Sequence, residues 1–563
     1  MKTSFTSSWR RGAVAAGLLG LLSSAAQAQT PAWSRAVGIG SAGSDLGRAI
    51  AVDGAGNTYV AGTYTSTTLT IGTTTLNNPG AVVLSTADIF VAKYGPTGTP
   101  LWATRLGGTN SETVGNLAVD NATGNVYLAG SFSGSLTVAG TTLTSAGAND
   151  MMLAMLNASG VPQWAMRAGG PADDIGAAVA LDNNGFVWLG GSFQGTATVT
   201  GASSNLVSAG DYDQALIKCS AATGAYVRMG REGGSGNDQL RALAADATTL
   251  VAAGFFAGAN LPVAGGPNLT RRCVNTDGYL IKYDQFITPQ WAKSEGASGA
   301  TSYANYAVSL DAGGIITTAG DFQGTIVVGN FDTIVNGGTA PAPMAVRYAA
   351  AGNVTSGRGT VNSAGRATSI VRDAAGNAYV SGYFSGTIQW SLSTATAAGS
   401  NDVFVAKLPA TGNAQWVVRA GSAADDQASA LAVDAAGNCY VTGFSAGSAT
   451  FGALTALPNA GTNDAFVAKL GSFALATRAA RAAEPLQAWP NPVAADRTLH
   501  LTLPGRGPAT LRLFDLTGRL AYEQPLPATA QPVLTLPATL APGHYLAEVQ
   551  SATQLLRRGL VVQ

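Results

Sequence analysis

Residues 51–62 read Ala51-Val52-Asp53-Gly54-Ala55-Gly56-Asn57-Thr58-Tyr59-Val60-Ala61-Gly62, and variants of this segment return along the chain. The segment is a short apolar run, an Asp, a Gly-Asn turn and a second apolar run that ends in Gly. Two such runs around a turn predict antiparallel strands, because Gly and Asn accept the positive φ that a reversal requires. The turn begins at seven Asp residues, roughly 62 residues apart: Asp53, Asp120, Asp182, Asp246, Asp311, Asp373 and Asp434.

A second segment follows each copy, first as Asp88-Ile89-Phe90-Val91-Ala92-Lys93 and, after a turn, Leu101-Trp102-Ala103. Its first half returns at Asp150, Asp213, Asp277, about Met344, Asp402 and Asp464. Its Trp returns at Trp164, Trp291 and Trp416, whereas Arg228 and Thr355 stand in the weaker copies. Each repeat therefore contains four predicted strands, and no run keeps a helical apolar period for roughly ten residues. Seven all-β repeats of this kind predict a seven-bladed β-propeller.

The two ends of the repeat array fit a closed ring. Residues Pro31 to Gly38 contain Trp33 and are similar to the fourth strand of a repeat, although no other strand of a repeat precedes them. The seventh copy, in contrast, runs into the less similar segment Phe473–Arg478. We expect the N-terminal strand to complete the seventh blade, because closure removes exposed sheet edges.

The repeat, Asp-x-Phe-Val-Ala-Lys followed by Trp-Ala, Gly-Gly and Ala-Val-Asp-x-x-Gly-Asn-x-Tyr-Val-x-Gly, resembles that of the secreted bacterial seven-bladed β-propeller (SBBP-type) proteins. The resemblance covers about residues 31–475 and is weaker in blades 4 and 5. It implies that residues 29–475 form one propeller.

Residues 1–28 have the organisation of a secretory signal peptide. Arg10 and Arg11 precede an apolar run from Ala13 to Leu22, and small residues lead to a cleavage site after Ala28. The apolar run is too short for a permanent membrane span. We expect an exported mature chain without a transmembrane segment.

The C-terminal region is a separate unit. Residues 476–487 are expected to be a small-residue linker, and strands separated by Pro and Gly turns are expected over 488–563. The order of its motifs resembles the C-terminal sorting domain of the type IX secretion pathway of Bacteroidetes, an immunoglobulin-like β-sandwich. The residues that carry this resemblance are Pro490, Asn491, Pro492, Gly518, Gly543 and Tyr545. The resemblance implies contact with the type IX machinery and translocation across the outer membrane, so that the protein is secreted or attached to the cell surface.

Composition narrows the class of function. The 563 residues carry 31 basic and 31 acidic side chains, and charged residues are only 11% of the chain. A neutral chain without a long basic run does not favour nucleic-acid binding. His500 and His544 are the only histidines, so the propeller has no imidazole for catalysis or metal binding. We expect no cofactor and no enzyme activity.

Three repeated sets of residues have a functional and a structural interpretation. The seven turn Asp residues suggest calcium, but one carboxylate per turn falls short of six to eight oxygen ligands, and Asp commonly caps such turns. The basic side chains at one position of the third strand either face a ligand or pack along the sheet: Lys93, Lys218, Lys282, Arg347, Lys407 and Lys469. The Trp set suggests either sugar stacking or packing between blades, and its fixed place in each repeat favours packing.

The three cysteines are expected to remain unpaired. Cys219 follows the third strand of blade 3 and Cys273 precedes that of blade 4, which places them at opposite strand ends. Cys439 lies within a second strand and is expected in the core.

The sequence thus predicts an exported, non-catalytic β-propeller that binds a surface protein or a glycan, as in adhesion. A carbohydrate-active hydrolase or lyase that uses Asp residues near the central channel is one alternative, marked by close carboxylates with raised pKa values in a channel pocket. A purely structural component of the cell surface is the other. Fold alone does not decide among them.

Overall fold

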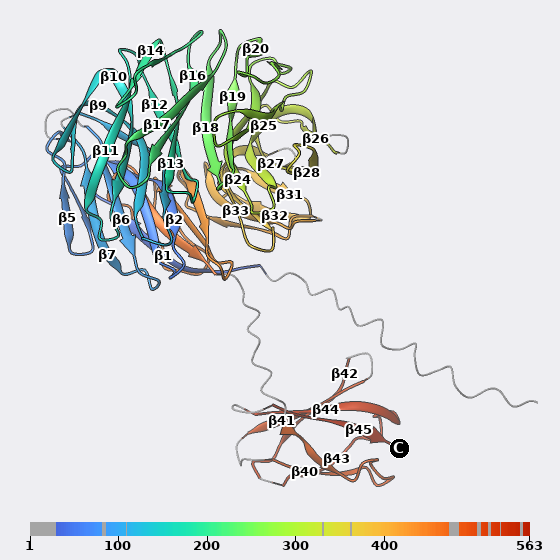
Figure 1. Cartoon of the computed structure of the whole chain (residues 1–563). Helices are drawn as coiled ribbons and strands as arrows, with labels where there is room; N and C mark the ends of the chain where they lie inside the picture. The colour runs from blue at the N-terminus through green and yellow to red at the C-terminus, as the bar shows by residue number, and fades with distance from the viewer. Residues whose placement is uncertain are drawn as a thin grey trace, which may run out of the picture. The chain divides into compact units, whose positions relative to one another are not determined.

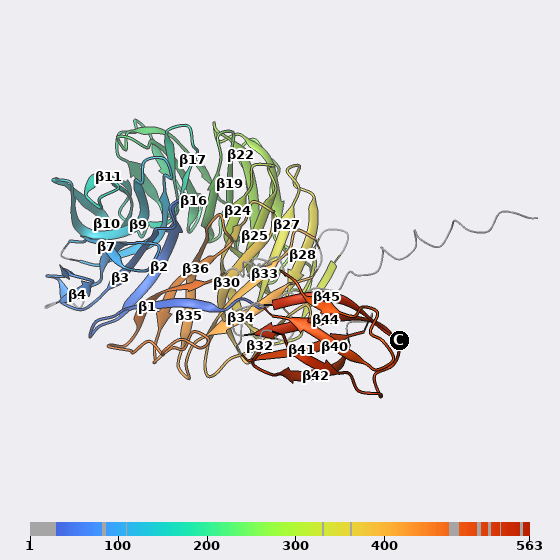
Figure 2. The same cartoon turned by 90° about the horizontal axis from the view of Figure 1, so that it is seen from below.

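Figure 1 and Figure 2 show the computed structural model of the chain. It describes residues 30–81, 86–108, 110–328, 332–360, 363–411, 413–471, 484–503, 508–515, 519–529, 531–551 and 555–563. The predicted signal peptide, the segment Phe473–Arg478 and Gly518 lie outside these residues. The chain divides into two compact units, Met1–Ser472 and Phe473–Gln563. In the described part, no helix has the length and apolar character needed to cross a membrane.

The first unit is a ring of antiparallel sheets built on one plan. Seven sheets in the described residues share the same order of four strands, and the first strand of each contacts the first strand of the next. Contacts between the last and the first of these strands close the circle, so the unit is a β-propeller whose blades we number 1 to 7. The first strands are β2 (Asp45–Val52), β8 (Glu112–Val119), β12 (Ile175–Leu181), β18 (Asp238–Ala245), β24 (Ser302–Leu310), β29 (Ala364–Arg372) and β35 (Asp426–Val433).

The other three strands of each blade lie progressively farther from this inner ring. The second strands are β3 (Thr58–Tyr64), β9 (Val126–Val138), β13 (Phe186–Phe193), β19 (Thr249–Phe256), β25 (Ile316–Val328), β30 (Ala378–Ser385) and β36 (Cys439–Ser445). The third strands are β6 (Asp88–Tyr94), β10 (Thr141–Leu156), β16 (Asp213–Ser220), β22 (Asp277–Asp284), β27 (Ala342–Tyr348), β33 (Asp402–Leu408) and β37 (Asp464–Leu470). The fourth strands are β7 (Pro100–Leu106), β11 (Pro162–Gly169), β17 (Tyr226–Glu232), β23 (Pro289–Ser294), β28 (Val354–Gly359), β34 (Trp416–Ala420) and β1 (Trp33–Ile39).

The second and third strands form the core of each blade. All residues of β3 are buried, as are six of the seven in β6, because neighbouring blades cover both faces of the sheet. A strand buried on both faces needs an almost continuous apolar run instead of an alternating one, and Tyr59-Val60-Ala61 and Ile89-Phe90-Val91 provide it. The runs quoted above therefore mark the middle of the blades.

Small hairpins extend between the second and third strands. Four are separate pairs, formed by β4 (Thr68–Ile71) and β5 (Thr74–Asn77), β14 (Thr196–Val199) and β15 (Asn205–Val207), β20 (Asn260–Leu261) and β21 (Leu269–Thr270), and β31 (Thr387–Trp390) and β32 (Ser393–Thr396). In blade 2 the hairpin is a continuation of β9 and β10, and in blade 5 β26 (Asp332–Asn336) pairs with β25. Because β14 also pairs with β11, this hairpin joins blade 3 to blade 2.

The N-terminal strand closes the ring, as the sequence predicts. β1 pairs antiparallel with β37, from Trp33 opposite Leu470 to Ile39 opposite Ala465. In Figure 1 and Figure 2 the blue β1 accordingly lies beside the orange strands of the last blade. The first and last parts of the propeller thus belong to one sheet.

The repeated Trp residues pack between blades. The indole of Trp102 in blade 1 lies on the turn between the third and fourth strands of blade 2, where its Nε1–H donates to the carbonyl of Ala158 at 3.1 Å. A Cβ added to Gly160, which has φ +78°, would approach the Trp102 ring to 2.5 Å. Trp291 repeats this contact with the carbonyl of Ala350, also at 3.1 Å. The prediction of packing between blades is confirmed, although Trp102 is only partly buried.

Two expected equivalences in this set are wrong. The residue opposite the basic side chain of the third strand is Arg35 in blade 7 and Ser356 in blade 5, not Trp33 and Thr355. The step from Lys93 to Trp102 and from Lys282 to Trp291 is nine residues, and the same step from Arg347 leads to Ser356, so the error for blade 5 was one of alignment. In blade 7 the fourth strand comes from the other end of the propeller, so no such spacing applies. Arg35 behaves like the Trp residues, since its Nη1 donates to Pro96 on the corresponding turn of blade 1 at 2.7 Å.

The second unit consists of two β-sheets with a shared apolar core. One sheet has the order β38 (Glu484–Pro485), β45 (Leu555–Val562), β44 (Gly543–Ser551), β41 (Ala509–Phe514) and β42 (Leu520–Leu526). The other has the order β39 (Gln487–Trp489), β40 (Thr498–Thr502) and β43 (Val533–Thr535). Leu499 and Leu501 alternate with partly exposed residues and meet Leu511 and Leu513 in the core. β38 and β39 begin at Glu484 and Gln487, within the span 476–487 that the sequence predicts as a linker.

The residues predicted as a sorting motif hold the edge of this unit together. Asn491 donates to the carbonyl of Gly559 at 2.9 Å and accepts from the amide of Val561 at 2.9 Å, which ties the Pro490-Asn491-Pro492 segment to β45. Gly543 begins β44, and the hydroxyl of Tyr545 donates to the carbonyl of Ala541 at 2.7 Å. These contacts give the residues a structural role.

We predict that Trp102→Ala lowers the stability of the propeller by about 3 kcal/mol, because full burial gives 3–5 and this ring is partly exposed. Chemical denaturation followed by circular dichroism measures the change. Leu101→Ala is the matched control, since the neighbouring Leu101 is 56% exposed and should change stability little. Equal stability of the Trp102 variant and the native chain would contradict a contact between blades.

Candidate functional site

A row of three side chains crosses each blade at the level of the Trp contact. In blade 1 the row is Tyr59 on β3, Lys93 on β6 and Trp102 on β7. The Tyr59 and Trp102 rings meet edge to face at 6.2 Å, and the Lys93 ammonium lies 4.7 Å from the centre of the Tyr59 ring. Tyr127 with Trp164 and Tyr379 with Trp416 repeat the ring pair at 6.1 Å. The pair fills the space between this end of one blade and the next.

Blade 5 departs from this pattern at all three positions. Its row is Thr317 on β25, Arg347 on β27 and Ser356 on β28. Hydroxyl side chains thus replace both rings, and the longer guanidinium replaces the ammonium. Since the row lies against blade 6, the loss of two rings is expected to leave space between blades 5 and 6.

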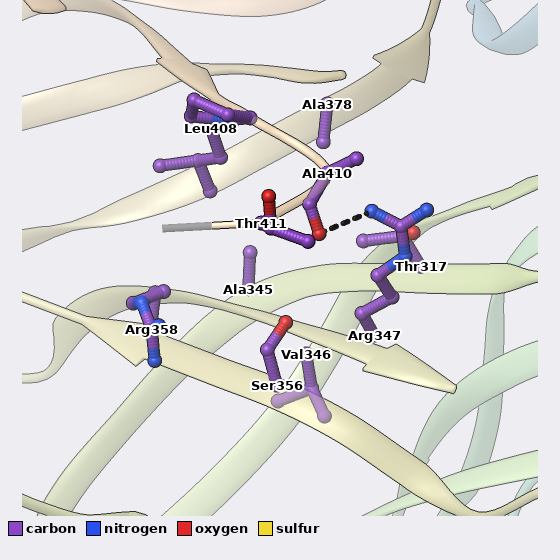
Figure 3. A pocket seen from close by; sticks show the side chains of 11 residues that line it. Thr317, Ala345, Val346, Arg347, Ser356, Arg358, Ala378, Leu408, Ala410 and Thr411 are labelled. Carbon is purple, nitrogen blue, oxygen red and sulfur yellow. Dashed lines mark hydrogen bonds between the residues drawn. The ribbon is translucent and has the colours of Figure 1, made fainter. Parts of the chain in front are cut away.

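A pocket occupies this space, as Figure 3 shows. It encloses about 430 Å³ including the part open to solvent, of which about 40 Å³ is available to the centres of water molecules. Since one water needs about 10–15 Å³ by this measure, the inner part holds roughly three waters. The residues that line it are Thr317, Ala345, Val346, Arg347, Ser356 and Arg358 from blade 5, and Ala378, Leu408, Pro409, Ala410 and Thr411 from blade 6.

Arg347 takes over the hydrogen bond that an indole makes in other blades. Its Nη1 donates to the carbonyl of Ala410 at 3.0 Å, the dashed line in Figure 3, and to that of Gly376 at 3.3 Å. Ala410 occupies the same turn position as Ala158 and Ala350, whose carbonyls accept from Trp102 and Trp291. Although Ser356 stands where other blades have Trp, the Ala410 carbonyl therefore still has a hydrogen-bond donor.

Arg347 is one of two guanidinium groups that line the pocket, the other being that of Arg358. No Asp or Glu lines the pocket, and in the described residues Arg347 makes no ion pair. Burial, and then the nearby Arg347 charge, lower the pKa of Arg372, although Arg372 pairs with Asp311 at 2.8 Å. The pocket therefore combines the guanidinium groups of Arg347 and Arg358, three hydroxyl side chains and an aliphatic wall.

The turn Asp residues cap their own turns. Asp53 accepts from the amides of Ala55 and Asn57, from the Asn57 side chain and from the hydroxyl of Tyr59. Asp373 and Asp434 repeat these contacts with Asn377 and Asn438. The hydrogen bonds to Asn57 and Tyr59 lower the pKa of Asp53, although burial acts in the opposite direction. Turn capping is confirmed.

The basic side chains of the third strands pack along the sheet, as the structural interpretation predicts. Lys218 pairs with Asp182 at 2.9 Å and lies 5.0 Å from the centre of the Trp188 ring. Lys407 and Lys469 lie on Tyr379 and Tyr440 in the same way. Lys282 and Arg347 have no aromatic ring at the corresponding position, which holds Val251 in blade 4 and Thr317 in blade 5, and both donate to backbone carbonyls of the next blade instead.

Pairs of buried carboxyl groups lie at the junctions between blades. In four of the pairs one group begins the third strand of a blade and the other begins the first strand of the next, whereas Asp150 lies inside β10 and Asp174 directly precedes β12. Gly169 shows how close they are, since its added Cβ would touch both Asp150 and Asp174 at less than 3.0 Å. The pairs are Asp88 with Glu112, Asp150 with Asp174, Asp213 with Asp238, Asp402 with Asp426, and Asp464 with Asp45.

Burial and the neighbouring carboxylate raise the pKa of the second member of these pairs. The pKa of Glu112 rises to about 9 beside Asp88, and that of Asp174 to about 7. Such values are those that a hydrolase at the channel would show. Yet both side chains are fully buried, and an Arg from the fourth strand binds Asp88 and Asp150. These pairs connect blades and are closed to a substrate.

Basic and aromatic side chains of blades 4 to 6 meet near the inner ring. Arg241 and Arg366 lie 5.9 and 4.1 Å from the centre of the Tyr306 ring, and Arg366 also pairs with Asp321 at 2.7 Å. Glycoside hydrolysis needs two carboxyl groups beside the scissile bond. This cluster offers one, and Arg366 already occupies it.

The cysteines are free and buried. Cys219 lies inside β16, because this strand continues to Ser220, whereas the sequence predicted Cys219 just after the strand. Cys273 precedes β22 as predicted. Cys439 belongs to the core of blade 7, which confirms its predicted place. In the described residues, no group of three or more His, Cys, Asp or Glu side chains is placed to hold a metal ion.

Sequence reasoning missed the pocket. The available signal was the weak fifth copy, in which the Trp is missing and the turn loses its Asn. A comparison of the copies at corrected register shows that Tyr, Lys and Trp are replaced together, as Thr317, Arg347 and Ser356. Simultaneous replacement within one row indicates a site more strongly than any single replacement.

Comparison with known proteins gives little further information. No family model matches the chain. A stretch of 159 residues is 30% identical to the "Uncharacterized WD repeat-containing protein L264" of Acanthamoeba polyphaga mimivirus and covers 26% of this chain and 11% of that protein. The chain therefore matches a small part of that relative's length.

Solved structures resemble the chain only distantly. A protein of unknown function from Dyadobacter fermentans DSM 18053 has a TM-score of 0.33 at 10% identity, over 78% of this chain and 99% of its own. The quinohemoprotein alcohol dehydrogenase from Comamonas testosteroni has a TM-score of 0.34 at 10% identity, over 78% and 77%. Scores this low carry no argument about function.

We predict that the propeller loses stability as the pH rises from about 5 to 9. An acid whose pKa is higher in the folded than in the unfolded state contributes stability below its unfolded pKa, near 4, and loses it as the pH rises through the folded value. The folded values are about 6 for Asp45 and Asp238, about 7 for Asp174 and about 9 for Glu112. Melting temperatures at intervals of pH measure the loss.

Glu112→Gln should flatten the part of this profile between about pH 7 and 9, because the amide does not ionise. Glu523→Gln, which changes an exposed carboxylate in the other unit, is the control. A profile that is level over this range, or unchanged by Glu112→Gln, would contradict a raised pKa of Glu112 in the folded chain.

Proposed function

We propose that this chain is an exported, non-catalytic β-propeller that binds a ligand outside the cell through the pocket between blades 5 and 6. The observation that carries the proposal is the joint replacement of Tyr, Lys and Trp by Thr317, Arg347 and Ser356, which opens the propeller at this junction. A propeller with a purely structural role would be more stable if side chains filled this junction, since buried space without contacts costs stability. An open junction between blades 5 and 6 therefore favours a role in binding over a purely structural one.

Binding is favoured over hydrolysis by the chemistry of the lining. The pocket offers guanidinium, hydroxyl and aliphatic groups, and no carboxyl group lines it. General acid and base catalysis of glycoside cleavage needs two such groups. The pocket therefore suits recognition of a polar ligand.

Export is the second part of the proposal. It rests on the predicted signal peptide in residues 1–28 and on the likeness of the C-terminal unit to the sorting domain of the type IX pathway. The two-sheet architecture of that unit and the anchoring role of Asn491 are compatible with this assignment. The proposed partners are thus the type IX machinery and a surface protein or glycan.

We predict that Ser356→Trp abolishes ligand binding and leaves the fold intact. Four other blades carry Trp at this row position, so an indole fits the local backbone and should fill the pocket. The full mature chain and this variant are screened against a glycan array and against proteins of the cell surface. Thr355→Trp, which adds an exposed indole one residue away, is the matched control.

The outcomes separate the candidates. Loss of binding in Ser356→Trp alone, at an unchanged melting temperature, supports the pocket as the binding site. Equal binding by both variants would refute it. Release of sugars from any array glycan would replace the binding function by hydrolysis.

We predict that a chain truncated after Ser472 remains in the periplasm, because the sorting unit is missing. Cell fractionation and surface labelling of a tagged chain measure its location. Truncated chain found on the surface or in the medium in native amounts would contradict export through this unit.

A further inference from the structure

The guanidinium of Arg347 gives the pocket a charged group at a defined position. Arg347 extends from the middle of the row, and its guanidinium lies at the blade 6 side of the pocket, beside Ala410 and Thr411 (Figure 3). It uses Nη1 for two carbonyls, so the planar group is held in place while its other N–H groups remain available. A guanidinium held in this way is suited to a carboxylate, which accepts two parallel hydrogen bonds.

The hydroxyl side chains provide a second type of contact. Thr317 and Ser356 flank Arg347 on the neighbouring strands, and Thr411 faces them from blade 6 (Figure 3). A hydroxyl both donates and accepts, as the hydroxyls of a sugar do. Val346 and Leu408 add apolar contacts for the C–H face of a ring. A ligand with a carboxylate next to hydroxyl groups would satisfy all three kinds of group.

Size limits how such a ligand enters. The space of about 40 Å³ that is open to water centres admits roughly three waters, which is too little for a whole sugar ring. The larger space of about 430 Å³ includes a part that is open to solvent. The ligand must therefore present a terminal group end-on and keep the rest of its chain outside.

We propose that the pocket binds the terminal acidic sugar of a glycan, with the sugar carboxylate on Arg347 and its hydroxyls on Thr317, Ser356 and Thr411. This inference rests on the proposed binding function and adds the class of ligand. A peptide with a free C-terminal carboxylate is less suitable, because the hydroxyl side chains around Arg347 would have no ring hydroxyls to meet.

The residues at the equivalent position of the other blades indicate which substitutions of Arg347 the fold accepts. Blade 2 carries Met155 where blade 5 carries Arg347, and blades 1, 3, 4, 6 and 7 carry Lys. Arg347→Met and Arg347→Lys thus place side chains that this fold already accepts at the same position. The first removes the charge, and the second keeps the charge but loses the planar pair of donors.

The experiment is isothermal titration of the full mature chain with D-glucuronate, D-glucose, an oligogalacturonate and a short peptide with a free C-terminal carboxylate. We expect the uronates to bind and D-glucose not to bind. Arg347→Met should weaken uronate binding about 10–100-fold, since a charge-assisted contact contributes that much. Arg347→Lys should weaken it less, and added salt should weaken it in the native chain.

Each other outcome overturns a defined part of the inference. Equal binding of D-glucose and D-glucuronate, or no effect of Arg347→Met, would refute the acidic ligand, while loss in Ser356→Trp would still support the pocket. Binding of the peptide without the uronates would refute the sugar. Uronate binding that survives Ser356→Trp would refute both the ligand assignment and the site.

Discussion

The hydrogen bonds between β1 and β37 are the constraint on which the propeller depends. Each blade buries its apolar second and third strands only against two neighbours, so a missing neighbour exposes both faces at once. A sheet that combines the two ends of the propeller closes this circle and leaves no blade at an end. The two terminal strands of the propeller therefore stabilise blades that are far from them in the sequence.

Two repeated contacts then hold neighbouring blades together. Near the turns between the third and fourth strands, a Trp or Arg of one blade donates to a carbonyl of the next, as Trp102 and Arg35 do. At the other end, two buried carboxyl groups face each other, and burial together with the neighbouring carboxylate raises the pKa of one of them, to about 9 for Glu112 and about 7 for Asp174. The repeats thus supply packing and polar contacts together, which explains why Gly169 and Gly160 are needed where the blades approach closely.

Repetition also gives the fold tolerance for a site. A ring with many equivalent junctions can lose the ring pair of one junction and keep the others. Blade 5 uses this freedom, because Arg347 restores the bond to Ala410 while Thr317 and Ser356 leave room beside it. The pocket is thereby formed by one deviating repeat and a turn of the next blade.

The sequence by itself determined the all-β fold, the repeats, the turns capped by Asp and the strand that closes the ring. These depend on local patterns: a run such as Tyr59-Val60-Ala61 or a turn such as Asp53 to Asn57 forms from neighbouring residues. Tertiary structure alone decided the pocket. Only the packing of blade 6 against the row of Thr317, Arg347 and Ser356 shows that the loss of two rings leaves an opening at this junction.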